Sequence, residues 1–143
     1  MKISEEFREQ IAEEFEYAHQ KMSAEQSPLR KLYWFTGSYS MAQRIMNLEY
    51  DDDLLFLFVV CQLAYERIQG RLATASRGAD LGAGLPDDIL AHLESMVAEL
   101  GVAIKANADL TPMLKRMAVL GYSATGNGYY LWSREKLSLG GAL

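Results

Sequence analysis

Hydrophobic and polar positions divide the chain into segments with helical periodicity, and residues 51–72 form the most hydrophobic of them. Leu54 to Cys61 are eight consecutive apolar residues, and only Gln62 interrupts the run before Tyr65. A helix that is apolar on every side is buried on every side. The preceding aspartates, Asp51–Asp53, favour the positive end of a helix dipole. We therefore expect a central helix that the rest of a bundle surrounds.

Two amphipathic helices are predicted before this segment. The first covers residues 4–22, because apolar side chains recur there at spacings of three and four and Ser4 is a suitable N-cap. The second covers residues 27–48, where Ser27 can cap the helix and Pro28 suits its first position. Gly37 lies in the middle of it, at a cost of about 1 kcal/mol relative to alanine. We expect close approach of another helix to compensate.

Two further helices are predicted in the second half of the chain. A glycine-rich segment, residues 77–85, is typical of a flexible loop. Pro86 then opens a helix with a regular apolar stripe to Ile104. Thr111 and Pro112 start a shorter helix that should end near Gly121. The sequence thus predicts four main helices and a short fifth one.

The hydrophobic period changes after this fifth helix. Aromatic, strand-forming segments flank Gly126-Asn127-Gly128, which suits the positive φ angles of a tight hairpin turn. The predicted fold is an all-α bundle in a single domain, residues 1–143, with a helix and hairpin appendage at residues 111–137. Half of the residues are hydrophobic and 23% are charged, as in ordinary globular domains.

Cysteine content and hydropathy suggest a cellular location. The single cysteine, Cys61, cannot form an internal disulfide bond, and no stretch near residue 1 has the pattern of a signal peptide. The apolar run is also shorter than the roughly 20 residues that a membrane span requires. We expect a cytoplasmic protein that does not cross a membrane.

Charge is unevenly distributed along the chain. The net charge is −5, but residues 1–26 carry three basic and seven acidic side chains, whereas residues 105–143 carry five basic and two acidic ones. The first helix has one strongly acidic side, formed by Glu9, Glu13, Glu14 and Glu16. That side is either a solvated face or an acidic docking surface. A polyanion would bind the C-terminal third instead.

The C-terminal third also contains a suggestive supersecondary pattern. A helix at residues 114–122, followed by the Gly-Asn-Gly hairpin and Tyr129-Tyr130-Leu131, resembles the recognition helix and wing of winged-helix DNA-binding domains. It departs from them because no short second helix and turn precede the recognition helix. The resemblance implies phosphate contacts from four basic side chains, Lys115, Arg116, Arg134 and Lys136.

Candidate catalytic and metal-binding residues are few. Glu16 and His19 have the three-residue spacing of di-iron carboxylate bundles, but a full site needs a second such pair. The only other histidine, His92, has Ile89 where the partner carboxylate should be. Cys61, inside the apolar run, is interpreted as a buried and inert thiol. We expect no metal, no cofactor and no catalytic residue.

A hydroxyl cluster on the second helix is a candidate pocket. Its members are Thr36, Ser38, Tyr39 and Ser40. They could supply polar groups to an apolar pocket. Alternatively, such hydroxyls bond to carbonyl groups of their own helix.

Aromatic residues exceed what one small core must bury. We expect five of them to form an interface, namely Tyr33, Trp34, Tyr129, Tyr130 and Trp132, because interfaces are enriched in tyrosine and tryptophan. The predicted assembly is a homodimer. The sequence favours a non-enzymatic interaction module, with a DNA-binding regulator as the alternative and a metal-binding bundle as a second alternative.

Overall fold

The computed structural model describes residues 1–76 and 89–121, and the regular structure of these residues is entirely helical. The helices are α1 (Glu5–Ala24), α2 (Pro28–Met46), α3 (Asp52–Ser76), α4 (Ile89–Lys105) and α5 (Thr111–Gly121). The predicted all-helical bundle is confirmed for this part of the chain. Three predicted features lie outside the described residues: the loop at 77–85, the start of the fourth helix at Pro86 and the C-terminal hairpin.

Local chemistry fixes where the first three helices begin. The side-chain oxygens of Ser4 and Ser27 each accept a backbone N–H from three residues further on, both at 3.4 Å. Pro28 follows Ser27 as the first residue of α2. Asp51 Oδ1 accepts the backbone N–H of Asp53 at 2.9 Å and caps α3. These helix starts confirm the predicted caps at Ser4 and Ser27, because each satisfies amides that have no partner within the helix.

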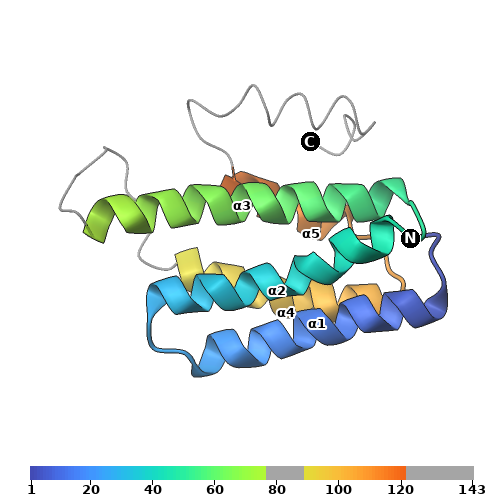
Figure 1. The fold of residues 1–143 in the computed structure, drawn as a ribbon, viewed down its shortest axis with the longest axis horizontal. Coiled ribbons are helices and arrows are strands. Elements are labelled where there is room, and N and C mark those ends of the chain that lie inside the picture. Colours follow the sequence, from blue (N-terminus) through green and yellow to red (C-terminus); the bar gives the residue numbers. More distant parts are fainter. Residues whose placement is uncertain (77–88, 122–143) are drawn as a thin grey trace.

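The first four helices run up and down along the long axis of the molecule (Figure 1). Helix α1 packs against α2 on one side and α4 on the other, while α3 packs against α2 and α5. Helix α4 has smaller contacts with α5 and α2. The short connections of residues 25–27 and 47–51 make their helices antiparallel neighbours, as expected for short bundle loops.

The expectation that α3 lies at the centre of the bundle is wrong. Among the described helices its main neighbours are α2 and α5. Leu54, Leu57 and Cys61 are fully buried, but Leu55 and Phe58 in the same run are partly exposed. In a bundle of so few helices each helix keeps one side toward the surface, so an apolar run does not require a central position.

All five helices contribute to one hydrophobic core. Its largest fully buried side chains are Phe15, Phe35, Ile11, Met22, Leu32, Ile45, Leu54, Leu57, Ile68, Leu93, Leu100 and Ile104. Within the described part of the chain, Ser38 is the one buried polar side chain. Its hydroxyl donates to the Phe35 carbonyl oxygen at 2.6 Å, which avoids an unsatisfied polar group in the core.

Two helical glycines have opposite surroundings. Gly37 is exposed, and a Cβ atom added to it would meet nothing within 4 Å among the described residues. The expected close helix approach at Gly37 is therefore wrong. It occurs at Gly101 instead, where an added Cβ would lie 3.3 Å from Phe15 Cβ and 3.6 Å from the backbone nitrogen of Glu16. Gly101 thus allows α1 and α4 to pack closely.

Polar contacts between distant segments fix the arrangement of the helices. The backbone N–H of Lys2 donates to Asp51 Oδ2 at 3.0 Å, and that of Ser4 donates to Glu49 Oε2 at 2.7 Å. These bonds tie the segment before α1 to the connection between α2 and α3. Lys31 of α2 pairs with Glu94 of α4 at 2.5 Å, with both side chains about one-fifth exposed. None of these pairs was expected from the sequence.

Candidate functional site

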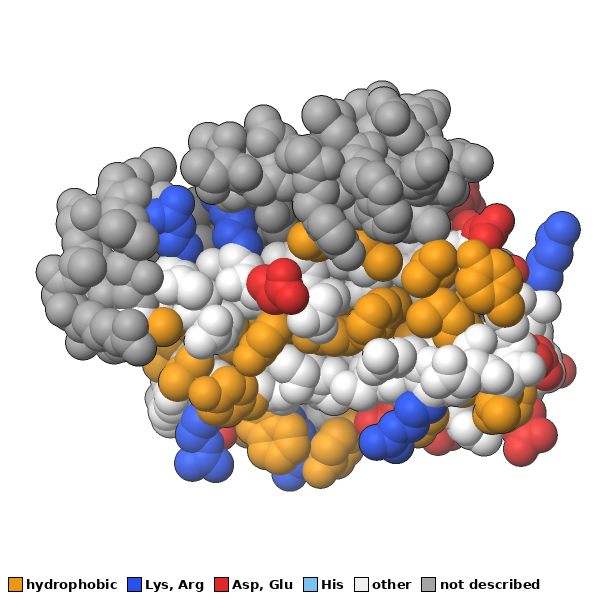
Figure 2. Space-filling model, turned by 45° about the horizontal axis from the view of Figure 1, so that its top comes forward, with side chains coloured by type: hydrophobic (Ala, Val, Ile, Leu, Met, Phe, Trp, Pro, Cys, Tyr) orange, Lys and Arg blue, Asp and Glu red, His pale blue; other side chains and the backbone are white. Residues whose placement is uncertain are grey.

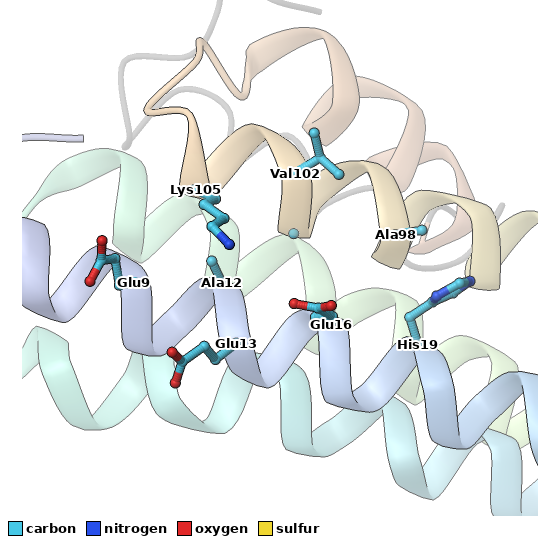
Figure 3. A pocket seen from close by; sticks show the side chains of 9 residues that line it. Glu9, Ala12, Glu13, Glu16, His19, Ala98, Val102 and Lys105 are labelled. Carbon is cyan, nitrogen blue, oxygen red and sulfur yellow. The ribbon is translucent and has the colours of Figure 1, made fainter.

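A groove of about 520 Å³ lies between α1 and α4 (Figure 3). Both helices contribute to it: α1 supplies Glu9, Ala12, Glu13, Glu16 and His19, and α4 supplies Ala98, Gly101, Val102 and Lys105. We call this the α1–α4 groove. Its volume is within the range of ordinary small-molecule pockets.

Small residues make this surface concave. Ala12, Ala98 and Gly101 lie along its floor, and Gly101 itself is buried. Because none of them has a side chain longer than a methyl group, the helix backbones are close and little fills the space above them. Val102, at the rim on α4, is 72% exposed. The groove therefore combines an apolar floor with an exposed apolar side chain.

The rim of the groove on α1 is acidic. Glu9, Glu13 and Glu16 are all exposed. Within the described part of the chain, no hydrogen bond or ion pair involves their carboxylates. Lys105 extends from α4 toward α1 (Figure 3), and it is the one lysine among the lining residues, which include three glutamates. The groove thus has an excess of negative charge.

The candidate metal ligands Glu16 and His19 both line the α1–α4 groove. The imidazole of His19 points toward α4 in Figure 3, and its Nε2 lies 3.5 Å from Ser23 Oγ. Residues 1–76 and 89–121 contain no group of three or more side chains suited to hold a metal ion. Two protein ligands are fewer than the three or four that zinc sites use, so the arrangement does not favour a metal site here.

A cluster of aromatic side chains lies where α1 meets α2. Tyr17 of α1 and Trp34 of α2 pack edge to face, with ring centroids 6.2 Å apart. The Lys21 ammonium lies 5.4 Å from the Tyr17 centroid and 5.5 Å from the Trp34 centroid. Tyr17 is 50% exposed and Tyr33, beside Trp34 in the sequence, is 51% exposed. We call Tyr17, Tyr33 and Trp34 the aromatic patch.

Hydrogen bonds hold Trp34 in position. Its indole Nε1 donates to Glu25 Oε2 at 3.3 Å, and Arg30 pairs with the same oxygen at 3.2 Å. Desolvation opposes ionisation of Glu25. However, the hydrogen bonds from the Ser27 amide and Trp34, together with the charge of Arg30, lower its pKa below the ordinary value. The ionised carboxylate therefore fixes Trp34 against the end of α1.

The predicted hydroxyl cluster is engaged with its own helix. Thr36, Ser38 and Ser40 donate to carbonyl oxygens three or four residues earlier in α2, at 2.6–2.7 Å. Tyr39 is buried and packs edge to face against Phe58 of α3 at 5.9 Å. Burial raises the pKa of the Tyr39 phenol. These residues do not line the α1–α4 groove, and their role in a pocket stays a prediction.

Of the candidate DNA-contacting residues, two lie in the described part of the chain. The Arg116 guanidinium donates to both carboxylate oxygens of Glu99 in α4. Lys115 is half-buried. Arg134 and Lys136 lie outside the described residues, as do Tyr129, Tyr130 and Trp132 of the predicted interface. The DNA-binding alternative stays a prediction.

The thiol of Cys61 is inaccessible to solvent. Cys61 is fully buried in α3, and this burial raises the pKa of its thiol. A protonated and inaccessible thiol is a poor nucleophile. The interpretation of Cys61 as a buried thiol is confirmed.

Sequence reasoning missed several residues of these surfaces. Tyr17 joins the aromatic patch because it contacts Trp34 of α2, and its position among polar residues of the first helix gave no signal. Ala12 and Gly101 could have been noticed as small residues on predicted helices. Their pairing across α1 and α4, however, depends on which helices become neighbours.

Among the described helices, none combines the length and the apolar character needed to cross a membrane. No protein-family model, no curated protein and no solved structure matches this chain significantly.

Proposed function

We propose that the protein is a non-enzymatic interaction module that self-associates as a homodimer through the aromatic patch. The observation that carries this proposal is the contact of Tyr17 of α1 with Trp34 of α2, beside Tyr33 in the sequence. Two of these rings are half exposed. Tyrosine and tryptophan supply large contact areas at interfaces, and they dominate the few residues that carry most binding energy.

The local order of the patch supports this function. Trp34 is held by Glu25 and by its packing against Tyr17. A rigid aromatic surface loses little conformational freedom on association, so more of its contact energy remains available for binding. The charged residues beside it, Lys21, Arg30 and Glu25, are of both signs, which limits repulsion between two copies.

Exposure of hydrophobic side chains alone does not identify an interface. The face in Figure 2 also has hydrophobic side chains at the surface, between charged and other polar groups. Single exposed apolar residues such as Leu48, at 72% exposure, are normal on soluble proteins. The aromatic patch differs because two of its rings, Tyr17 and Trp34, come from different helices and contact one another.

Analytical ultracentrifugation at micromolar protein concentration tests this proposal. We expect the wild-type chain to sediment as a dimer. The double variant Tyr17→Ser, Tyr33→Ser removes two exposed rings and should weaken dimerisation by about 10–100-fold, as loss of a central interface residue does. Leu48→Ser is the matched control, since it removes an exposed apolar side chain beyond the other end of α2.

A wild-type chain that remains monomeric throughout the micromolar range would contradict self-association. Equal weakening by Leu48→Ser would show that the aromatic patch is not the interface. Circular dichroism of each variant checks that it has folded. All three side chains are exposed and none is part of the buried core, so we expect both variants to fold.

A further inference from the structure

We propose that the α1–α4 groove is a docking site for a basic amphipathic helix of a partner protein. The groove lies on the flank of α1 that faces α4, whereas the aromatic patch lies on the flank that faces α2. The proposal rests on the function as an interaction module, but it does not require the homodimer. It develops one of the two interpretations of the acidic side of α1.

The shape of the groove suits a helix. Its floor is built from Ala12 of α1 and from Ala98 and Gly101 of α4, so side chains of a third helix can fit between the two. Helices pack when side-chain ridges of one enter the grooves of another. Val102, at 72% exposure, offers an apolar contact at the rim.

Charge identifies the partner as basic. Glu9, Glu13 and Glu16 follow one another at spacings of four and three residues, which places them along one side of α1 over about 10 Å. Within residues 1–76 and 89–121 these carboxylates have no ion-pair partner, and Lys105 is the single cation among the residues that line the groove. A helix with lysine or arginine at the same spacings would match them.

The internal ion pairs support this assignment. Both acidic side chains of α4 are already paired with cations, Glu94 with Lys31 and Glu99 with Arg116. The groove carboxylates remain exposed on a surface that is concave rather than convex. Electrostatic complementarity across such a surface steers association and selects against acidic partners.

Binding can be measured with a synthetic probe. The probe is a fluorescently labelled, lysine-rich amphipathic peptide of about 20 residues, long enough to form a helix on its own. Its control has the same composition with two central prolines, which break the helix. We expect the wild-type chain to bind the helical peptide in fluorescence anisotropy at low salt, and to bind the proline peptide about tenfold more weakly.

Variants of the chain separate charge from shape. Glu9→Gln, Glu13→Gln, Glu16→Gln removes three exposed charges and should weaken binding about tenfold, as the loss of three surface ion pairs predicts. Asp52→Asn, Asp53→Asn, Glu66→Gln removes the same charge from α3 and should leave affinity unchanged. Ala98→Leu fills the floor without changing any charge and should also weaken binding.

Each opposite result would overturn the docking site. Equal loss in the α3 variant would mean that binding follows net charge alone, and full affinity in Ala98→Leu would mean that the peptide does not enter the groove. Equal binding of the proline peptide would exclude a helical partner. If the wild-type chain binds neither peptide but sediments as a dimer, the groove proposal fails while the proposed function stands. A chain that is monomeric and binds neither peptide contradicts both.

Discussion

At the scale of single residues, Gly37 and Gly101 show that glycine can stand in opposite surroundings within a helix. Gly101 removes a side chain where α1 and α4 are in close contact, whereas Gly37 faces open space. In a helix interior, glycine costs about 1 kcal/mol relative to alanine because of its backbone entropy. Only at Gly101 does close packing offset that cost.

Substitution of each glycine by alanine tests this difference. We expect Gly37→Ala to raise the free energy of unfolding by about 0.5–1 kcal/mol, since the added methyl group meets nothing. Gly101→Ala gains the same helix propensity but brings a methyl group within 3.3 Å of Phe15 Cβ. Its stability should therefore fall at least about 1 kcal/mol below that of Gly37→Ala.

Urea denaturation at one protein concentration measures both variants. Equal stabilisation by the two substitutions would show that α1 and α4 can move apart freely at Gly101. A loss of stability in Gly37→Ala would show that its surroundings are not open.

At the scale of secondary-structure elements, Asp51 has two functions. One carboxylate oxygen caps α3 by accepting the Asp53 N–H at 2.9 Å, and the other accepts the Lys2 N–H at 3.0 Å. Capping is local, but the second bond connects the start of α3 to the segment before α1. One side chain therefore sets both a helix boundary and the position of a distant segment.

Two substitutions of Asp51 separate these functions. Asp51→Ala removes the cap and the bond to Lys2, and should lower the free energy of unfolding by about 2 kcal/mol. Asp51→Asn keeps one acceptor oxygen, which can still cap α3, and should lose only about half as much. Thermal unfolding followed by circular dichroism measures both. Equal losses would mean that the cap contributes nothing beyond the bond to Lys2.

At the scale of the whole molecule, the distribution of charge bears on the DNA-binding alternative. The net charge is −5, and Arg116, which the winged-helix resemblance assigns to phosphate binding, is engaged with Glu99. Both side chains of this pair are about half exposed, so it contributes little to stability. It does occupy the guanidinium that a phosphate would need.

The proposed interaction module, unlike the regulator, predicts no binding of duplex DNA at physiological salt. Fluorescence anisotropy with labelled duplexes checks this, and titration at lower salt extends the range. Two results together would contradict this expectation. One is binding that weakens steeply with salt, and the other is a double variant, Lys115→Ala with Arg116→Ala, that binds more weakly and with less dependence on salt. It would support the regulator instead of the interaction module.

Much of the fold follows from the sequence by itself. The starts of α1 and α2 follow from Ser4, Ser27 and Pro28, because a cap needs only a side-chain oxygen and the next few amides. The core-facing stripes of the helices follow from a spacing of three and four residues. These are local relations, determined within a turn or two of the chain.

Only the tertiary structure decided which helices became neighbours. That choice put α3 beside α2 and α5 rather than at the centre, and it brought Tyr17 to Trp34 and Gly101 to Phe15. Periodicity tells which side of a helix is buried but not against what, because the pairing depends on the packing of all the side chains at once. The aromatic patch and the α1–α4 groove each need residues from two helices, so neither could be assembled from one segment of sequence.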